Sequence, residues 1–228
     1  MIDIHSHILP AVDDGCKDID QSLALIKEEI NQGITDIVLT PHYRAEYLLR
    51  RAKIEKRFAS LTQAVQDSGI TVNLYLGQEI FVFDGMISAI HSGKLFTING
   101  SKYVLVEFAT KEEHDITDTV YTLVGAGFVP IIAHIERYYY ADMEMAKEIK
   151  ELGGLIQINA SSLCRRFGAY KKKATAFIKE GLVDFVASDV HFKRRNCMLQ
   201  AYNVVVKKFG RETADKLFTE NAEKILNG

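Results

Sequence analysis

Short apolar runs alternate with longer segments of helical periodicity from one end of the chain to the other. Seven runs have the length and the β-branched content of strands, and they cover residues 1–7, 36–40, 72–77, 103–108, 129–133, 155–159 and 184–188. Their apolar character is nearly continuous rather than alternating, which is typical of parallel strands buried on both faces. We therefore expect a parallel sheet covered by helices.

The segments between these runs carry apolar side chains three and four residues apart. In the clearest one, Ile19, Leu23 and Ile26 fall on one stripe, so the spacing predicts a helix over 19–31 with Asp18 as its N-terminal cap. Further helices are expected over 50–67, 142–152, 169–179, 199–209 and 212–226, and a shorter helical pattern ends at Gly125-Ala126-Gly127.

Strand–helix alternation repeated about seven times predicts an α/β fold with a parallel sheet that is either doubly wound or closed as a barrel. No Gly-x-Gly-x-x-Gly turn and no P-loop follows any of the runs, so the common glycine-rich phosphate loops are missing from the sequence. The chain has no linker, no low-complexity segment and no short-period repeat. We therefore expect one domain over residues 1–228.

Composition and charge narrow the function classes. The 228 residues are 47% hydrophobic and 25% charged, which is the balance of a folded soluble protein. The net charge of −2 argues against general binding to the nucleic acid backbone. Three widely spaced cysteines without a Cys-x-x-Cys pair fit a reducing compartment. The N-terminus lacks a signal-peptide pattern, and no apolar run approaches the ~20 residues of a membrane span, so we expect a cytoplasmic protein without membrane insertion.

Metal-capable side chains close six of the seven runs at their carboxyl ends. They are His5 and His7 in the first run, His42 after the second, Glu79 after the third, Glu107 in the fourth, His134 after the fifth, and Asp189 and His191 after the seventh. The carboxyl ends of parallel strands meet on one face of an α/β fold, where ligand sites form. Five of the seven histidines lie at these ends, so we expect one polar site there.

The residue types and their spacing indicate a metal centre. Residues i and i+2 of a strand point the same way, so the His-x-His and Asp-x-His pairs each present two ligands to one side. Imidazoles and carboxylates suit zinc, manganese, iron or cobalt, and a carboxylate such as Glu79 can bridge two ions. Any one of these residues alone fits a cap or a loop position, whereas eight together favour a metal centre. Asp14, in the loop after the first run, is either part of a turn or a further ligand.

Arginines follow the same strand ends. Arg137 lies three residues after His134, and Arg194 and Arg195 lie three and four residues after His191. Comparable positions after the second and sixth runs hold Arg44, Arg165 and Arg166. A guanidinium matches phosphate oxygens, so arginines beside metal ions favour a phosphate ligand, although each alone fits a surface position equally well. No cysteine has an arginine six positions later and no Gly-x-Ser-x-Gly motif occurs, which disfavours a thiolate phosphatase and a serine hydrolase.

In combination these motifs resemble the polymerase-and-histidinol-phosphatase (PHP) superfamily, and more closely the bacterial manganese-dependent protein-tyrosine phosphatases of capsule and exopolysaccharide operons. The motifs are Ile2-Asp3-Ile4-His5-Ser6-His7, Val12-Asp13-Asp14-Gly15, Thr40-Pro41-His42, Gly77-Gln78-Glu79-Ile80, Ala133-His134-Ile135-Glu136-Arg137 and Val186-Ala187-Ser188-Asp189-Val190-His191. They extend over essentially the whole chain. The resemblance implies a distorted TIM-like (β/α)7 barrel with a trinuclear metal site at the carboxyl ends of the strands.

The resemblance also implies a set of ligands and a cofactor. One ion would be held by His5, His7, Glu79 and Asp189, a second by Glu79, Glu107 and His134, and a third by Asp14, His42 and His191. The phosphate would be contacted by Arg137 and by either Arg194 or Arg195. Manganese is the expected cofactor, with up to three ions bound, and iron, cobalt, zinc and magnesium are alternatives.

The implied activity is metal-assisted hydrolysis of a phosphomonoester. Its substrate would be phosphotyrosine on the tyrosine-rich tail of a bacterial tyrosine kinase that regulates capsule or exopolysaccharide synthesis. Three alternatives stay open: a phosphatase for histidinol phosphate or another small molecule, a nuclease or proofreading enzyme, and a non-catalytic metal-binding regulator. The mild acidity argues against the nuclease, and neither nucleic acid nor membrane is an expected partner. The sequence makes no prediction of the oligomeric state.

Overall fold

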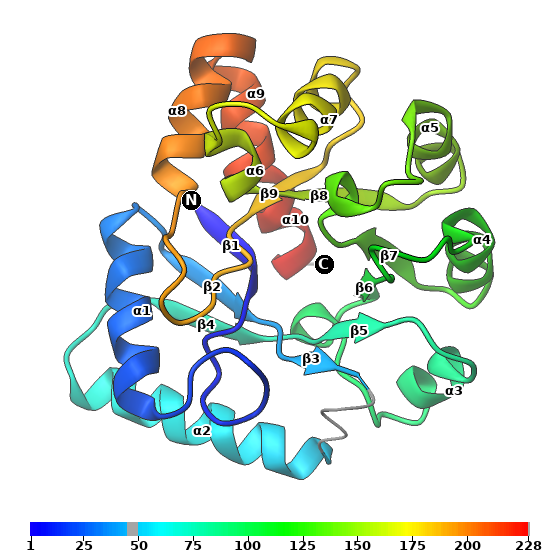
Figure 1. The fold of residues 1–228 in the computed structure, drawn as a ribbon. Helices are drawn as coiled ribbons and strands as arrows, with labels where there is room; N and C mark the ends of the chain where they lie inside the picture. The colour runs from blue at the N-terminus through cyan, green and yellow to red at the C-terminus, as the bar shows by residue number, and fades with distance from the viewer. Residues whose placement is uncertain (45–49, 228) are drawn as a thin grey trace.

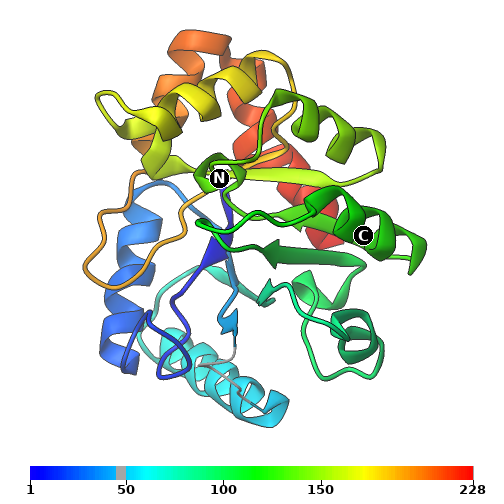
Figure 2. The ribbon, with the colours of Figure 1, turned by 45° about the vertical axis from the view of Figure 1, so that its right-hand side comes forward.

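The computed structural model describes residues 1–44 and 50–227, in which nine short strands surround the centre of the molecule and helices cover them on the outside (Figures 1 and 2). The strands are β1 (Ile2–Ser6), β2 (Asp36–Leu39), β3 (His42–Tyr43), β4 (Asn73–Leu76), β5 (Glu79–Phe81), β6 (Tyr103–Glu107), β7 (Val129–Ile132), β8 (Leu155–Asn159) and β9 (Phe185–Ala187). Their pairings are parallel, as the continuous apolar runs predict.

The strands form one closed ring, although hydrogen bonding divides them into a sheet of β1, β2 and β4 and a sheet of β3, β5, β6, β7, β8 and β9. β2 runs on into β3 and β4 into β5, and backbone hydrogen bonds of 2.9 and 3.2 Å continue the pairing across both breaks. β1 meets the chain after β9 at the Ser6–Val190 bridge, which closes the ring. Ser188 stabilises this seam, because its N–H and its hydroxyl donate to the Asp3 carboxylate at 2.9 and 2.6 Å. The expected distorted TIM-like barrel is confirmed.

Helices connect the strands and pack around the ring. They are α1 (Ile19–Asn31), α2 (Arg51–Asp67), α3 (Met86–His91), α4 (Ile116–Gly125), α5 (Met143–Glu151), α6 (Ala160–Cys164), α7 (Ala169–Lys179), α8 (Met198–Phe209), α9 (Arg211–Asp215) and α10 (Asn221–Asn227). Two short 3-10 turns, η2 (Ile98–Gly100) and η3 (Ile135–Arg137), and a π-helical turn, η4 (Lys216–Glu220), complete the set. In this part of the chain, no helix combines the length and the apolar character needed to cross a membrane.

The helical periodicity predicts most of these bounds well. The helices expected over 19–31 and 169–179 are confirmed to the residue, and those over 50–67, 142–152 and 199–209 to within one residue at each end. The helix expected over 212–226 is divided into α9, η4 and α10 by the π-helical turn. The short elements β3, β5, α3 and α6 were not predicted, because two to six residues are too few to show a period.

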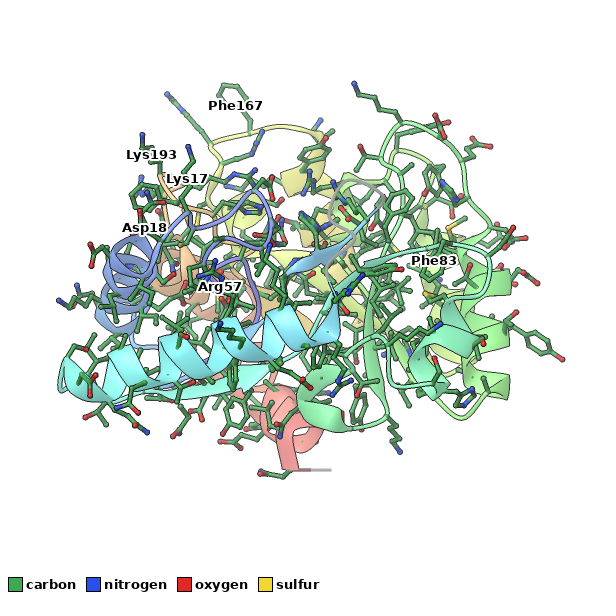
Figure 3. All side chains as sticks on the ribbon, turned by 90° about the horizontal axis from the view of Figure 1, so that it is seen from below. Lys17, Asp18, Arg57, Phe83, Phe167 and Lys193 are labelled. Atoms are coloured by element: carbon green, nitrogen blue, oxygen red, sulfur yellow. The ribbon has the colours of Figure 1, made fainter. Side chains whose placement is uncertain are left out.

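The amino-terminal half of the barrel interior is apolar. Inward-facing side chains from five strands pack there, namely Ile4, Val38, Leu105, Ile131 and Phe185. Ala222 and Ile225 of α10 pack against them, so α10 closes the amino end of the barrel. A larger apolar cluster fills the space between the strands and the surrounding helices. Figure 3 shows α10 at the bottom of the view, whereas Phe167 and Lys193, from loops at the carboxyl end, project from the opposite edge.

Above this layer, the inward-facing positions change from apolar to polar. In β6, Leu105 belongs to the apolar interior, and Glu107, two residues later, faces the carboxyl end of the barrel. β1 also changes from apolar to polar inward-facing side chains, but it does so through a shift of its register against β2 in its second half. Ile4 packs in the interior, yet the next residue, His5, and then His7 also point inward. A regular strand would send Ile4 and His5 to opposite faces, so this irregularity brings both histidines to the barrel mouth.

Gly77, between β4 and β5, offers a test of the packing where the strand breaks. A Cβ at this position would lie 2.9 Å from the Ile98 Cδ1 atom and 3.2 Å from the Val38 Cγ1 atom. We expect Gly77→Ala to lower the free energy of unfolding by about 1–3 kcal/mol through overpacking, measured by urea denaturation. The control is Gly125→Ala at the end of α4, where no atom lies within 4 Å of the added Cβ. Equal unfolding midpoints for the two variants would contradict the packing described here.

Candidate metal centre and anion pocket

All nine residues expected to bind metal converge at the carboxyl end of the barrel. They are His5 of β1, His7 and Asp14 of the loop after β1, His42 of β3, Glu79 of β5, Glu107 of β6, His134 after β7, and Asp189 and His191 after β9. Eight of them are buried, and Asp14 is exposed. The two histidines that the sequence placed outside this group, His91 and His114, lie elsewhere, against aromatic rings. Strand topology therefore brings together one complete set of nitrogen and oxygen donors.

Glu79 lies at the centre of this cluster, where its carboxylate faces four imidazoles. Its Oε1 atom lies 3.3 Å from His5 Nε2 and 3.0 Å from His134 Nε2. Its Oε2 atom lies 3.3 Å from His7 Nε2 and 2.6 Å from His42 Nδ1. A carboxylate shared in this way has the geometry of a bridging ligand, which agrees with the expectation from the sequence.

The donor atoms form three overlapping groups, each within 4.8 Å. The groups are His5, His7 and Asp189; His7, Asp14, His42 and His191; and His42, Glu79 and Glu107. His134 adjoins the third group, 3.0 Å from Glu79 and 3.5 Å from Glu107. The Nε2 atoms of His5 and His7 are 3.2 Å apart. Ligands of one ion are separated by about 3–4 Å when each lies about 2.1 Å from it, so the residues present fit bound divalent ions.

The charges of these groups are mutually stabilised. Burial alone would raise the pKa of Glu79, but the neighbouring His5 and other imidazoles hold it well below its usual range. Burial would also raise the pKa of Asp189, but the nearby imidazoles, that of His5 foremost, lower it to about 2. At His134, burial would lower the pKa, but Glu107 and Glu79 raise it to about 9. Glu79 and Asp189 are therefore ionised, and His134 takes up a proton that a divalent ion would displace.

Two polar residues of β8 orient the histidine and carboxylate donors. Gln157 Oε1 lies 3.2 Å from His5 Nδ1 and accepts a hydrogen bond from the His134 N–H at 2.7 Å. Asn159 donates to Asp189 Oδ2 at 2.7 Å. In the sequence, this run is the one strand without a metal-capable side chain at its carboxyl end. Its signal was present, because Gln157 and Asn159 form an i, i+2 polar pair at the end of an apolar strand.

Asp13 is a further residue of the site, for which the sequence predicts no role of its own. Its Oδ2 atom lies 2.8 Å from His7 Nδ1 and accepts a hydrogen bond from the His42 N–H at 3.0 Å. Asp13 also accepts from the Gly15 N–H at 3.0 Å, so the turn is present as well. A carboxylate behind an imidazole fixes the tautomer and the ring orientation of a metal-ligating histidine.

Two of the donors have a left-handed backbone. His134 has φ of 34° and Asp189 has φ of 50°, a conformation that residues other than glycine rarely adopt. The His134 N–H is held by Gln157, and the Asp189 N–H donates to the His5 carbonyl at 2.9 Å. Neighbouring strands therefore hold both residues in this conformation, which is frequent at functional sites.

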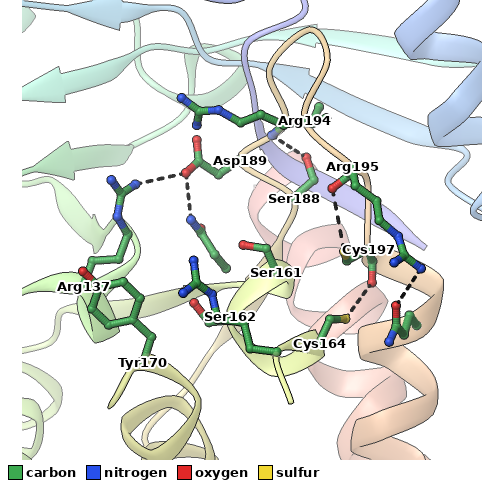
Figure 4. Close-up of a pocket in the computed structure, with 14 residues that line it drawn as sticks. Arg137, Ser161, Ser162, Cys164, Tyr170, Ser188, Asp189, Arg194, Arg195 and Cys197 are labelled. Atoms are coloured by element: carbon green, nitrogen blue, oxygen red, sulfur yellow. Dashed lines mark hydrogen bonds and ion pairs between the residues drawn. The ribbon is translucent and has the colours of Figure 1, made fainter. Parts of the chain in front are cut away.

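A cavity of about 640 Å³ opens beside the donor cluster (Figure 4). Arg137, Arg194 and Arg195 line it, and Asp189 forms the wall toward the cluster. The Arg137 Nη1 atom lies 3.2 Å from Asp189 Oδ2. Figure 4 shows the Arg194 guanidinium above the Asp189 carboxylate, whereas Arg195 points to α8 and donates to Gln200 Oε1 at 3.1 Å. The structure thus separates the two arginines that the sequence could not distinguish.

The other arginines have different surroundings. Arg44 forms an ion pair with Glu107, one of the donors, and lines a smaller cavity with Arg137. Arg165 lines the cavity of Figure 4 and lies 5.6 Å from the centre of the Tyr170 ring. Positive charge is therefore concentrated around the donor cluster, which favours an anionic ligand.

The loop over residues 192–197, which carries Arg194 and Arg195, is fixed to α1. The Asn196 N–H donates to Glu28 at 3.2 Å, and the Asn196 amide donates to the buried carboxyl of Glu29. Burial raises the pKa of Glu29 well above its usual range, so this group keeps its proton and is a neutral partner. The end of the loop next to α8 is therefore held in place by buried polar contacts.

Comparisons with known proteins agree with this site. A family profile described as capsular polysaccharide synthesis, CpsB/CapC, matches residues 1–227. The tyrosine-protein phosphatase CpsB of Streptococcus agalactiae is 35% identical over 238 residues, covering 99% of this chain and 98% of the relative. The tyrosine-protein phosphatase YwqE of Bacillus subtilis is 34% identical, covering 99% and 91%. A crystal structure from work on YwqE and on CpsB of Streptococcus pneumoniae, described as metal-dependent tyrosine phosphatases, superposes with a TM-score of 0.93 at 33% identity and covers 100% of this chain and 94% of its own.

The role of Gln157 as an orienting residue can be tested separately from catalysis. Gln157→Met keeps the side-chain volume but removes the acceptor for His5 Nδ1 and the His134 N–H, so we expect manganese affinity to fall about 10–100-fold. Isothermal titration calorimetry measures this change, with circular dichroism as the check on folding. Gln63→Met, at an exposed position of α2, is the matched control and should bind manganese as the parent protein does. An unchanged affinity in folded Gln157→Met would remove Gln157 from the site.

Proposed function

The chain belongs to the CpsB/CapC family of capsular polysaccharide synthesis, and from this membership we propose that it hydrolyses phosphotyrosine as a metal-dependent tyrosine-protein phosphatase. Relatives that bear this activity in their names match the chain over 99% of its length. The observation that carries the proposal is the contact between the arginine-lined cavity and the donor cluster at Asp189. A phosphate in this cavity meets guanidinium groups on one side and the metal donors on the other.

The nine clustered residues are the proposed metal ligands. One ion would be held by His5, His7 and Asp189, a second by Glu107 and His134, and a third by Asp14, His42 and His191. Glu79 would be shared by the first two ions. Manganese is the proposed ion, although such a set of carboxylates and imidazoles also accepts iron, cobalt, zinc or magnesium. When bound, the ions would polarise the phosphoryl group and make a water molecule nucleophilic near neutral pH.

The chain's own residues supply the remaining parts of the reaction. Arg137 lies against Asp189 at the edge of the donor cluster, so its guanidinium is placed to neutralise phosphoryl oxygens as charge develops on them. Arg194 lines the same cavity, and its guanidinium lies above the Asp189 carboxylate in Figure 4. Asn159 holds the Asp189 carboxylate in place by donating a hydrogen bond to its Oδ2 atom. The leaving phenolate of tyrosine has a pKa of about 10, so it needs less help from an acid than an alkoxide does.

The proposed natural substrate is a phosphotyrosine tail of a bacterial tyrosine kinase. A flexible anionic segment suits a cavity with an arginine rim, and Arg165 and Tyr170 extend that rim away from the donors. The family's link to capsule synthesis supports a kinase of that process as the partner. We place the enzyme in the cytoplasm, as one domain over residues 1–228.

Metal removal tests the proposed activity directly. Protein treated with a chelator and dialysed should lose hydrolysis of a phosphotyrosyl peptide, and added manganese should restore it, because the donor cluster would then be reoccupied. Phosphate release is the measurement, and histidinol phosphate is assayed separately as the alternative substrate. Activity that survives chelation contradicts metal dependence. Turnover of histidinol phosphate without turnover of the peptide favours the small-molecule alternative.

The two loop arginines provide a matched pair of variants. Arg194→Ala should lower kcat/KM for the peptide about 100-fold, because it removes a cation aimed at the phosphoryl site. Arg195→Ala should change it by less than about fivefold, since its guanidinium lies on Gln200 in an exposed contact. Steady-state kinetics of both manganese-loaded variants makes the comparison. A larger loss from Arg195→Ala would reverse the assignment.

A further inference from the structure

Two of the three cysteines meet at the wall of the cavity, although the sequence separates them widely. Cys164 is the last residue of α6, and Cys197 is the residue that caps the start of α8. The Cys164 thiol donates to the Cys197 carbonyl at 3.5 Å, and the Cys197 thiol donates to the Arg195 carbonyl at 3.7 Å (Figure 4). The two thiols also interact with each other. The ends of α6 and α8 are therefore already in contact through these residues.

Both sulfur atoms are accessible from the site. Cys164 and Cys197 are partly exposed, and both line the cavity that contains Arg194 and Asp189. The third cysteine, Cys16, is buried in the core. A small oxidant that enters the cavity thus reaches the pair without unfolding the protein.

We propose that Cys164 and Cys197 form a reversible disulfide when a two-electron oxidant such as hydrogen peroxide reaches the cavity. The net reaction converts two thiols and one peroxide into one S–S bond and two water molecules, so the thiols are oxidised and the peroxide is reduced. A disulfide needs Cα atoms about 4.4–6.8 Å apart. The 3.5 Å contact between one sulfur and the other residue's carbonyl places the two backbones close to that range.

The surroundings of the two thiols set the order of the steps. Burial and the adjacent Cys197 raise the pKa of the Cys164 thiol to about 12, which keeps Cys164 protonated. The Cys197 thiol is also the more exposed of the two, because its contact with the Arg195 carbonyl lies at the surface, whereas the Cys164 contact is part-buried. The Cys197 sulfur therefore attacks peroxide, which breaks the O–O bond and gives a sulfenic acid and water. The Cys164 sulfur then displaces the hydroxyl group from Cys197, forming the disulfide and releasing the second water.

The bond would act on the anion pocket through the chain on either side of it. Cys197 lies three residues after Arg194, and Cys164 is followed directly by Arg165. Asn196 lies between Arg194 and Cys197 and is hydrogen-bonded to Glu29, so a link that pulls on Cys197 must strain this contact and the loop that carries Arg194. We expect the shift to displace Arg194, and a displacement of this kind costs activity because the guanidinium must meet the phosphoryl group. This effect on activity rests on the proposed function, whereas formation of the disulfide does not.

The experiment treats manganese-loaded protein with hydrogen peroxide or, in parallel, with the thiol oxidant diamide. Remaining thiols are then alkylated, and the protein is digested without reductant for mass spectrometry. We expect a cross-linked peptide pair containing Cys164 and Cys197, lighter by two hydrogen atoms, with Cys16 alkylated. The oxidised enzyme should lose about tenfold in kcat/KM for the phosphotyrosyl peptide and regain it with dithiothreitol.

Three variants separate the possible outcomes. Cys164→Ser and Cys197→Ser should show no cross-link and no change in activity on oxidation, whereas Cys16→Ala should behave as the parent protein does. Absence of the Cys164–Cys197 peptide overturns the proposed site. A cross-link that leaves activity unchanged overturns its effect on Arg194. If the reduced protein does not hydrolyse phosphotyrosine at all, the proposed function fails, and the peptide map still decides whether the disulfide forms.

Discussion

The architecture depends on keeping one ionised carboxylate, Glu79, buried among four imidazoles. An isolated buried charge would be far too costly, so the imidazoles around it must compensate it. This requirement fixes the identity of the residues at the barrel mouth and holds the strands close together there. It also explains why the site needs orienting groups, since Gln157 and Asp13 set which nitrogen of His5 and of His7 faces the carboxylate.

The barrel separates its two tasks along its axis. The amino end is apolar and closed by α10, so it supplies hydrophobic stabilisation without approaching the site. The carboxyl end holds the charges and opens into the arginine-lined cavity. The change between these layers takes place within one or two residues of each strand, and in β1 it needs an irregular register to bring His5 inward. Stability and chemistry are thus assigned to different ends of the same strands.

Most of the site could be predicted from the sequence, because parallel strands bring their carboxyl ends to one face and i, i+2 spacing identifies the side chains that share it. The alternation of apolar and helical segments predicts an α/β fold with a parallel sheet, whereas the barrel was expected only from the family resemblance. Gln157 and Asn159 were missed because amides are weak signals for metal chemistry when considered alone. The choice between Arg194 and Arg195 required the loop conformation, which depends on a buried contact with α1. Nothing in the sequence indicates that Cys164 and Cys197 are neighbours, because their proximity is created by the packing of α6 against α8.

The seam of the barrel has a consequence for the synthesis of the chain. Asp3 and Ser188, which stabilise the seam, are 185 residues apart in the sequence, and each is followed closely by donors of the metal centre. While the ribosome is still making the first eight strands, the early histidines have no partner from the residues after the last one. A nascent chain therefore lacks the complete set of donors, and the centre is assembled only when synthesis is almost finished.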